Sequence, residues 1–234
     1  MDTSAAGYFG KLPCAGDFVS RRLPRRFVQP WDAWLSRALA ASLERFGATW
    51  LDDYLVSPFW RFVLSPGLCG GEAWAGVMMA SVDRVGRAFP MTVAAPAGAG
   101  AFATVLNSEA WFSAVEDRLL AALQEEVNVT AFDQSLAGLP LQGGPVQPPA
   151  ADAAAWRISL APGNGDAAAL SPLLDHLARN ASQPYSCWAT TGSPSVSASL
   201  LVCPGLPADR HFGAFIDGDW RQAGWADLPG RDAP

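Results

Sequence analysis

Apolar residues recur at helical spacing in two long stretches of the chain. Between Pro30 and Phe46 they follow one another at intervals of three and four, and the stripe consists of Trp31, Trp34, Leu35, Ala38, Leu39, Leu43 and Phe46. This spacing predicts an amphipathic helix of about four turns that starts at Pro30 and stops at Gly47. A second helix is predicted from Asn107 or Ser108 to about Val127, with a buried face formed by Trp111, Val115, Leu119 and Leu123. Shorter helices are expected at 50–55, 166–179 and 206–215.

Shorter apolar runs bounded by turn residues predict strands. They lie at 7–12, 59–64, 73–82, 88–95, 156–160, 186–190 and 196–203. The runs at 73–82 and 88–95 are separated by a short turn, so we expect an antiparallel pair. Residues 13–26 are expected to form a loop, because Pro13, Gly16 and Pro24 interrupt any regular pattern. The order of elements predicts an α/β fold of the α+β type, with a mixed, largely antiparallel central sheet and helices packed on its faces.

Three charged residues interrupt the apolar sequence between the runs at 73–82 and 88–95. They are Asp83, Arg84 and Arg87, in the segment SVDRVGRAFP at 81–90. An unpaired charge at the junction of two buried strands is costly, so the simplest expectation is that Asp83 pairs with one of the arginines. Two interpretations remain open: a structural ion pair that closes a tight strand connection, or a binding site at the end of a strand.

The charged turn is one of several motifs that together carry a family resemblance. The others are GYFGKLP at 7–13, GDFV at 16–19, PWDAWL at 30–35 and SPFWRF at 57–62, with a weaker match at 186–193 and 205–212. With these motifs the chain resembles the TagF family, also called ImpM, whose members are accessory proteins of the bacterial type VI secretion system. The departures are small: Ala80 replaces a usual proline, and Met91 and Val93 replace usual leucines. The resemblance favours a single TagF-like domain over residues 4–226.

Two segments have a composition typical of loops. Gly, Pro, Ala and Gln dominate residues 138–155, which we expect to form a flexible internal loop. The polar end of the chain, 227–234, is expected to be frayed.

The resemblance to TagF implies a function in regulation. It implies a non-enzymatic cytoplasmic protein that represses type VI secretion after its components are made, by binding the FHA-domain scaffold protein of that system. Two other functions stay open: a phosphate- or nucleotide-sensing domain, and an assembly factor that supports the secretion apparatus. Protein interfaces are centred on aromatic and arginine anchors. The candidate partner-binding residues are therefore Arg21, Arg22, Arg25, Arg26, Trp60, Arg84 and Arg87.

Charge separates one part of the chain from the rest. The 234 residues carry a formal net charge of −6, which argues against nucleic-acid binding as the main activity. Residues 11–26 are locally basic, because this segment contains five basic residues and only one acidic residue, Asp17. Such a segment either attracts an acidic partner or a phosphate, or is simply a solvated loop.

Motifs for catalysis and cofactor binding are missing from the sequence. Gly10-Lys11 is followed by Leu12-Pro13, which cannot complete a P-loop, and no dinucleotide fingerprint or nucleophile elbow occurs. His176 and His211 belong to no nucleophile–base or metal-ligand pattern, and the four cysteines are dispersed. We therefore expect no catalytic residue, no metal and no cofactor. The first residues do not resemble a secretory signal and the apolar runs are too short for a bilayer, so we expect a cytoplasmic location without membrane insertion.

The charged residues beside predicted strands suggest a polar cluster. Lys11 is the only lysine beside fifteen arginines, which hints that a compact ammonium is needed at this position. Arg61 lies within an apolar strand, where it either points outward at an edge or pairs with an acid such as Asp83. Our hypothesis is that several of these groups converge in one cluster, drawn from Lys11, Asp17, Arg61, Asp83, Arg84 and Arg87. The hypothesis fails if the structure spreads them over separate faces.

Overall fold

A computed structural model describes most of the chain outside one long internal segment. The described residues are 5–97, 103–104, 107–124, 127–141 and 183–226. The strand predicted at 156–160 and the helix predicted at 166–179 lie outside them. So do residues 142–155 of the predicted loop and the expected frayed tail at 227–234.

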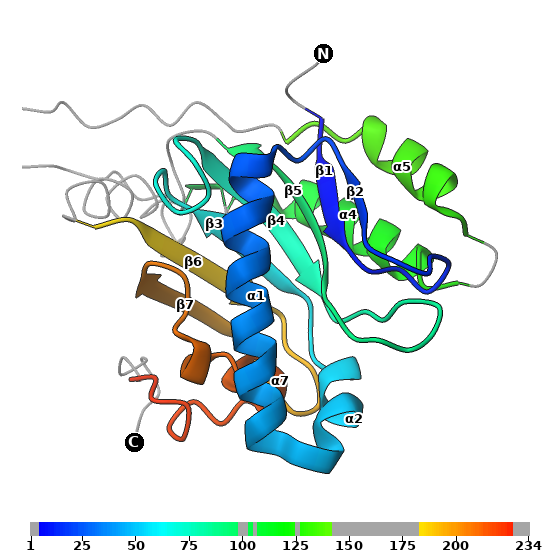
Figure 1. Ribbon diagram of the computed structural model, residues 1–234. Helices are drawn as coiled ribbons and strands as arrows, with labels where there is room; N and C mark the ends of the chain where they lie inside the picture. Colours follow the sequence, from blue (N-terminus) through cyan, green and yellow to red (C-terminus); the bar gives the residue numbers. More distant parts are fainter. Residues whose placement is uncertain (1–4, 98–102, 105–106, 125–126, 142–182, 227–234) are drawn as a thin grey trace, which may run out of the picture.

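The described part of the chain is built on a seven-stranded sheet in the order β2-β1-β5-β4-β3-β6-β7 (Figure 1). Its strands are β1 (Gly7–Gly10), β2 (Val19–Arg21), β3 (Trp60–Leu64), β4 (Ala73–Met79), β5 (Met91–Ala97), β6 (Tyr185–Thr190) and β7 (Ser199–Pro204). Each neighbouring pair is antiparallel. The α+β fold class expected from the sequence is therefore confirmed.

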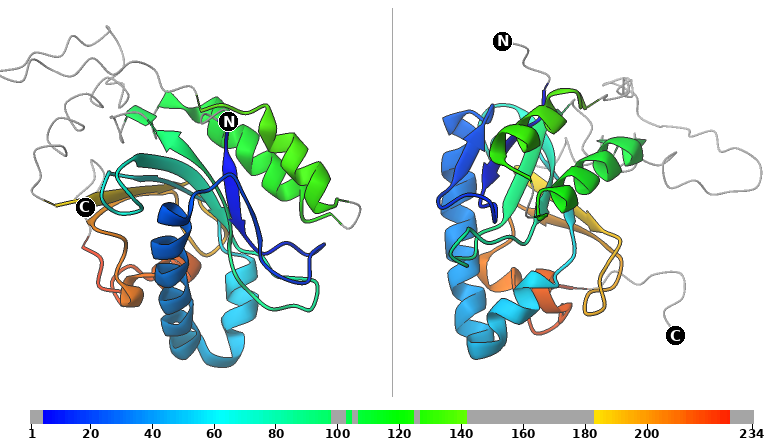
Figure 2. Two further views of the ribbon diagram at one scale, coloured as in Figure 1. Left: turned by 45° about the horizontal axis from the view of Figure 1, so that its top comes forward. Right: turned by 90° about the vertical axis from the view of Figure 1, so that its right-hand side faces the viewer.

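Helices cover both faces of this sheet. The long helix α1 (Arg25–Phe46) lies on one face, and α4 (Glu109–Ala121) and α5 (Val129–Ala137) lie on the other (Figure 2). Shorter elements pack near the end of α1: η1 (Gly47–Thr49), α2 (Trp50–Leu55), η2 (Asp209–His211) and α7 (Ala214–Asp217). Alternate side chains of each strand consequently enter two separate cores.

Aromatic residues dominate the core beneath α1. Trp31 and Trp34 are buried and contact each other, and both contact Trp188 of β6. Their indole N–H groups are satisfied, because Trp31 donates to Thr92 Oγ1 at 3.0 Å and Trp34 donates to the Pro207 carbonyl at 2.8 Å. A buried indole needs such an acceptor. The tryptophan pair is thus part of the core, as the helical spacing predicted.

The core beneath α4 and α5 is more aliphatic. It joins Val63, Val77 and Val93 of the central strands to side chains from the two helices, which are Trp111, Phe112, Val115, Leu119, Phe132 and Leu136. Trp111, Val115 and Leu119 of the predicted helix face are buried as expected, but Leu123, also expected there, lies beyond the end of α4 and is 38% exposed. Arg61 of β3 projects on this same side of the sheet, since it alternates with Trp60 and Phe62 of the other core.

The prediction of a loop over 13–26 is wrong at its C-terminal end. Residues 19–21 form the edge strand β2, and α1 starts at Arg25, so Pro30 lies inside the helix rather than in its first turn. Pro24, in an extended conformation, precedes the helix. Arg25 and Arg26 are exposed and add no apolar residue to the stripe. The start of the helix was therefore predicted too far along the chain. Leu43, expected in the core, is 50% exposed.

Other element boundaries also differ from the prediction. The helix expected to reach Val127 ends at Ala121, and a separate helix, α5, follows, with the Asn128 side chain accepting a hydrogen bond from the Ala131 N–H. The last predicted helix, 206–215, is replaced by η2 and the short α7. β5 continues through Pro96 to Ala97, two residues beyond the predicted end of this strand at 95.

Gly76 of β4 lies very close to its neighbours, and its substitution tests how tightly the sheet and the aromatic core are packed. A Cβ atom added at Gly76 would overlap the Phe62 ring and the Val93 carbonyl. We predict that Gly76→Ala lowers the free energy of unfolding by about 1–3 kcal/mol, because overpacking forces neighbouring groups to move. Gly71→Ala is the control, since nothing lies within 4 Å of its added Cβ. Urea denaturation measures both, and equal stabilities of the two variants would contradict the packing.

Candidate partner-binding site

The charged turn between β4 and β5 closes on itself through the backbone. The Asp83 N–H donates to the Arg87 carbonyl at 3.0 Å, and the Gly86 N–H donates to the Asp83 carbonyl at 2.9 Å. Gly86 has φ of 84°, in the left-handed region that glycine adopts without strain. Val82 and Ala88 pair across the base of the turn. The turn is therefore defined by its backbone and by one glycine.

The Asp83 carboxylate is buried at the centre of the turn, with 2% of the residue exposed. Its Oδ1 accepts hydrogen bonds from the backbone N–H groups of Val85 at 3.1 Å and Arg87 at 2.9 Å. Its Oδ2 contacts Arg87 Nε at 2.7 Å and Lys11 Nζ at 3.2 Å. Burial by itself raises the pKa of this carboxyl, but the donors from Arg87, Lys11 and Val85 outweigh it and hold the pKa of Asp83 well below its usual range.

Lys11 connects the turn to the end of β1. Its ammonium group also donates to the Arg87 carbonyl at 3.3 Å and lies 5.2 Å from the centre of the Phe18 ring. The Lys11 backbone is held as well, because Ser81 Oγ donates to its carbonyl at 2.7 Å. Lys11 is thus largely enclosed, and the compact ammonium suggested by the sequence fits a carboxylate, a carbonyl and an aromatic face.

The loop after β1 is bonded directly to the charged turn. The Arg84 N–H donates to the Ala15 carbonyl at 2.8 Å, and Arg87 Nη2 donates to the Gly16 carbonyl at 2.8 Å. The Arg84 guanidinium lies against Gly16, where an added Cβ would come within 3.1 Å of Nη2. We call residues 13–18 and 83–87 together the loop pair. The two loops project side by side beyond the sheet, next to β1 and β2 (Figure 1).

Tyr54 of α2 fixes the strand end from which the charged turn begins. Its hydroxyl donates to the Ser81 carbonyl at 3.1 Å and accepts from the Ser81 N–H at 2.9 Å. Burial raises the pKa of this hydroxyl, so Tyr54 stays protonated and able to donate. Sequence reasoning missed Tyr54, because a lone tyrosine in a short helix carries no signal of this contact.

The loop pair presents a mixed apolar and basic surface to solvent. Val85 is 70% exposed and Phe18 is 43% exposed. Arg84 is exposed beside Val85, and its guanidinium has no carboxylate partner among the described residues. Asp17 is exposed and accepts a hydrogen bond from the Phe18 N–H at 2.8 Å, so it shapes the loop and does not join the buried cluster.

Arg61 lies in a different polar site on the α4 side of the sheet. Its guanidinium makes paired hydrogen bonds to both Glu116 and Glu109 of α4, at 2.5–3.0 Å. The bonds to Glu116 raise the pKa of Arg61, burial lowers it by less, and Glu109 adds to the increase. The suggested pairing of Arg61 with Asp83 is therefore wrong. The seven-residue spacing of Glu109 and Glu116 on one helix face could have indicated this site.

Three of the six charged residues in the cluster hypothesis meet around one carboxylate: Lys11, Asp83 and Arg87. Arg84 is attached to them through its backbone alone. Asp17 and Arg61 do not join the cluster. The cluster predicted from the sequence is thus smaller than expected, and it brings together the charged turn and the end of the first strand.

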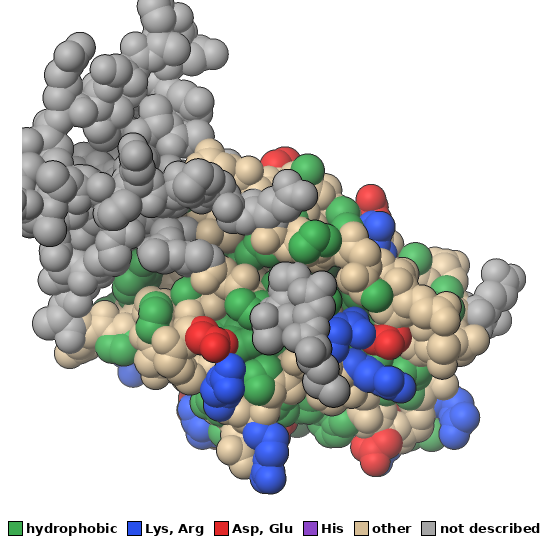
Figure 3. All heavy atoms as spheres, turned by 90° about the horizontal axis from the view of Figure 1, so that it is seen from above, with side chains coloured by type: hydrophobic (Ala, Val, Ile, Leu, Met, Phe, Trp, Pro, Cys, Tyr) green, Lys and Arg blue, Asp and Glu red, His purple; other side chains and the backbone are tan. Residues whose placement is uncertain are grey.

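The basic residues of the N-terminal segment have separate roles in the structure. Arg22, with φ of 63°, donates to the Ala6 carbonyl at 2.7 Å and to Asp133 of α5 at 2.6 Å. Arg26 pairs with Glu72 at 3.0 Å. Arg21 and Arg25 are exposed. On the face seen in Figure 3, basic side chains are interspersed with acidic ones instead of forming one continuous patch.

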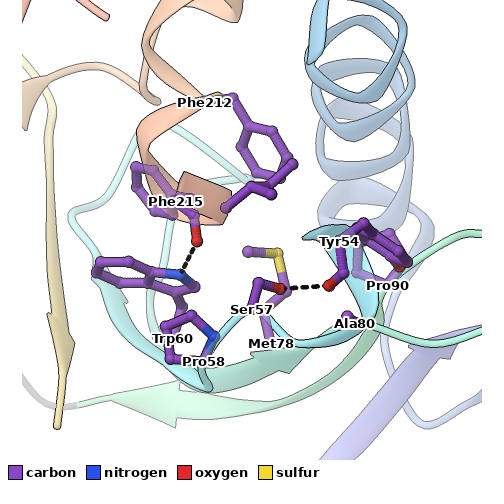
Figure 4. A pocket seen from close by; sticks show the side chains of 10 residues that line it. Tyr54, Ser57, Pro58, Trp60, Met78, Ala80, Pro90, Phe212 and Phe215 are labelled. Carbon is purple, nitrogen blue, oxygen red and sulfur yellow. Dashed lines mark hydrogen bonds between the residues drawn. The ribbon is translucent and has the colours of Figure 1, made fainter. Parts of the chain in front are cut away.

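Trp60, the remaining candidate anchor, is buried in the core. Its indole donates to the Phe215 carbonyl at 3.1 Å, and its ring packs on the Phe215 ring (Figure 4). The adjoining cavity has a volume of about 10 Å³, which is room for roughly one water. Trp60 is therefore not available for a surface contact. Sequence reasoning could not separate an aromatic anchor from an aromatic core residue here.

Two further features bear on the class of protein. Within the described residues, no group of three or more His, Cys, Asp or Glu side chains is arranged to hold a metal ion. None of the helices in the described part of the chain has the length and apolar character that a membrane span requires.

The fold and the site define an α+β domain with an exposed, internally braced loop pair. Residues 7–139 match the family described as TagF N-terminal domain, type VI secretion system-associated. The structure is similar to the crystal structure of PA0076 from Pseudomonas aeruginosa PAO1, with a TM-score of 0.80 and 41% identity, over 98% of this chain and 100% of that chain. No curated protein matches the chain. The chain belongs to the TagF family and is associated with the type VI secretion system.

The low pKa of Asp83 predicts an acid-sensitive fold. The folded-state pKa of Asp83 lies below the usual value of about 3.9. Asp83 therefore stabilises the folded state above that pH, and this stabilisation is lost as the pH falls below it. Glu109 acts in the same direction, because its bond to Arg61 lowers its pKa. We predict that Asp83→Asn lowers stability at neutral pH and flattens the loss of stability on acidification. Asp17→Asn is the control, and the melting temperature of each variant is measured from pH 7 to pH 3. If both substitutions change the pH dependence of the melting temperature equally, the role of Asp83 is disproved.

The two carboxylates on Arg61 are expected to contribute unequally. The Glu116 side chain is 20% exposed, whereas that of Glu109 is 69% exposed. We predict that Glu116→Gln lowers the free energy of unfolding by about 1–3 kcal/mol, since a partly buried charged hydrogen bond is lost. Glu109→Gln should cost less than about 1 kcal/mol, because water screens an exposed ion pair. Chemical denaturation of both variants decides the order, and a larger effect at Glu109 would refute it.

Proposed function

We propose that this protein is a cytoplasmic, non-enzymatic regulator that represses type VI secretion by binding the FHA-domain scaffold protein of that system. Membership of a family associated with type VI secretion supports a role in this system. The observation that carries the proposal is the loop pair, which lies within the matched residues 7–139 and presents Arg84 and Val85 to solvent. Binding at this surface would keep the scaffold from the rest of the apparatus.

The bracing of the loop pair favours a role in recognition. A surface that is already held in one conformation loses less entropy when a partner binds, so more of the contact energy appears as affinity. Asp83, Lys11 and the backbone bond from Arg84 to Ala15 supply this order in the free protein. Phe18 and Arg84 belong to the residue types that dominate binding energy at interfaces. The exposed Arg21 and Arg25 would lie outside the centre of the contact.

The structure lends less support to phosphate or nucleotide sensing. Such a site would need several free cations around one ligand, but Lys11 and Arg87 are both engaged with Asp83. Arg84 remains the exposed guanidinium at the turn. A role as an assembly factor uses the same surface, so the sign of the effect on secretion separates it from repression.

Binding to the purified FHA-domain scaffold tests the proposed partner. We expect calorimetry to detect the wild-type complex and Arg84→Ala to weaken it by roughly 30-fold, as for a central interface arginine. Arg25→Ala serves as the matched control, because Arg25 is exposed at the start of α1, away from the loop pair, and should change the affinity by less than about threefold. The absence of wild-type binding would refute direct sequestration, and an equal loss in both variants would move the contact elsewhere.

Deletion of the protein in the cell tests the direction of regulation. A repressor predicts increased export of type VI substrates, with unchanged levels of the apparatus components. Complementation with wild-type protein should restore the low level, and complementation with Arg84→Ala should not. Reduced secretion after deletion would contradict repression and favour an assembly factor.

A further inference from the structure

We propose that the loop pair recognises an anionic side chain flanked by an apolar one on a segment of its protein partner. The anion is a carboxylate, because one free guanidinium can pair with its two oxygens, whereas a phosphate group would need further free cations that Lys11 and Arg87, engaged with Asp83, do not supply. This inference deepens the proposed function and rests on it for the identity of the partner. It assigns Arg84 as the contact to the anion, and Val85 with Phe18 as the contact to the apolar neighbour.

Among the described residues, Arg84 is the exposed guanidinium of the site whose side chain makes no hydrogen bond, whereas Arg87, whose side chain is 60% exposed, is partly engaged. Lys11 is enclosed by Asp83, the Arg87 carbonyl and the Phe18 ring. Arg87 uses Nε on Asp83 and Nη2 on the Gly16 carbonyl. Arg84, in contrast, is hydrogen-bonded through its backbone N–H, and its guanidinium, which lies against Gly16, carries no carboxylate in the described part of the chain. A planar guanidinium with free donors binds carboxylate and phosphate oxygens in pairs.

Exposed apolar residues neighbour this guanidinium in both loops, since Val85 follows Arg84 and Phe18 is two residues from Gly16, against which the guanidinium lies. Val85 follows Arg84 directly and is the most exposed large hydrophobic residue in the described chain, at 70%. Phe18 leaves part of its ring in solvent while the rest packs on Phe9 at 5.4 Å and Phe89 at 4.8 Å between ring centres. These contacts hold Phe18 in place without burying it. A partner that contacts Arg84 would therefore also cover Val85 and Phe18, which favours an apolar side chain beside the anion.

The charge distribution favours an anionic segment of a protein over a membrane surface. The whole chain has a net charge of −6, and of the five basic residues in 11–26, all of them described, only Lys11 forms an ion pair with the loop pair, so Arg84 is a local positive charge on an acidic molecule. A narrow acidic segment can reach the loop pair without bringing negative charge close to the rest of the molecule. An anionic bilayer presents a broad charged plane, which the acidic remainder would repel. The loop pair offers two large exposed apolar side chains, Phe18 and Val85, for insertion, whereas interfacial anchors bury a continuous apolar face.

Peptides of defined charge test the inference without the scaffold. The probes are three peptides with identical leucine-rich flanks and glutamate, phosphothreonine or glutamine at the centre. We expect the first two to shift the NMR signals of the Arg84 side chain and of the Val85 and Phe18 amides in a saturable manner. The glutamine peptide should leave these signals unchanged, and the two anionic peptides should leave the Val85 and Phe18 amide signals of Arg84→Gln unchanged. Shifts by the phosphothreonine peptide alone would contradict recognition of a carboxylate. Equal shifts by all three peptides, or none by either anionic peptide, would overturn the inference.

The scaffold complex provides the second arm of the test. Arg84→Gln should weaken binding by roughly tenfold or more, Val85→Ser by about threefold or more, and Arg84→Lys by less than Arg84→Gln. Arg25→Gln is again the matched control. Affinity should also fall as salt rises, and less so for Arg84→Gln. If neither Arg84→Gln nor added salt changes the affinity for the scaffold, this inference is overturned while the proposed function stays in place. If the anionic peptides bind but the scaffold does not, the proposed partner fails and the inference stands.

A membrane arm uses vesicles of phosphatidylglycerol. The protein is expected to remain in the supernatant when such vesicles are sedimented. Sedimentation that is lost on Val85→Ser would show that the loop pair binds a lipid surface, and would contradict recognition of a protein segment.

Discussion

The Asp83 carboxylate lies where the β4–β5 turn meets the end of β1, and it stays ionised there because donors from both segments surround it. Lys11 and Arg87 neutralise its charge, and two backbone N–H groups complete its hydrogen bonds. Each partner depends on the others, since removal of one member of a buried pair leaves an uncompensated charge. The form of the exposed turn is therefore set from beneath. The surface that carries Arg84 and Val85 takes its shape from this buried carboxylate.

The order of strands explains how residues distant in sequence come together at this carboxylate. β1 pairs with β5, so the end of β1 arrives beside the connection that leads into β5, and Lys11 can reach Asp83. On the other side, α2 brings the Tyr54 hydroxyl to Ser81, and Ser81 in turn holds the Lys11 carbonyl. The aromatic core under α1 and the aliphatic core under α4 fix the sheet that positions these segments. The position of the loop pair is thus a consequence of sheet topology and of a few buried polar groups.

Sequence patterns predicted the sheet, the main helix and the charged turn, because each depends on local periodicity or on an unusual concentration of charge. They failed where exposure decides the outcome. Trp60 and Arg61 are neighbours in an apolar run, yet the first is a core residue and the second pairs with acids on α4. Alternation along a strand shows that the two side chains point in opposite directions, but it does not show which residues pack against each face of the sheet. The edge strand β2 was missed because three residues, two of them exposed, leave no pattern to detect.

Asp83 holds the two loops as one ordered unit, and amide hydrogen exchange tests this role most directly. The Arg84 N–H bonds to the Ala15 carbonyl across the two loops, and the Arg87 N–H bonds to Asp83 itself. In Asp83→Asn we predict much faster exchange at Arg84 and Arg87, while amides in the middle of α1 keep their wild-type protection. Unchanged exchange at Arg84 and Arg87 in this variant would contradict the claim, because the loop pair would then be ordered without the buried carboxylate.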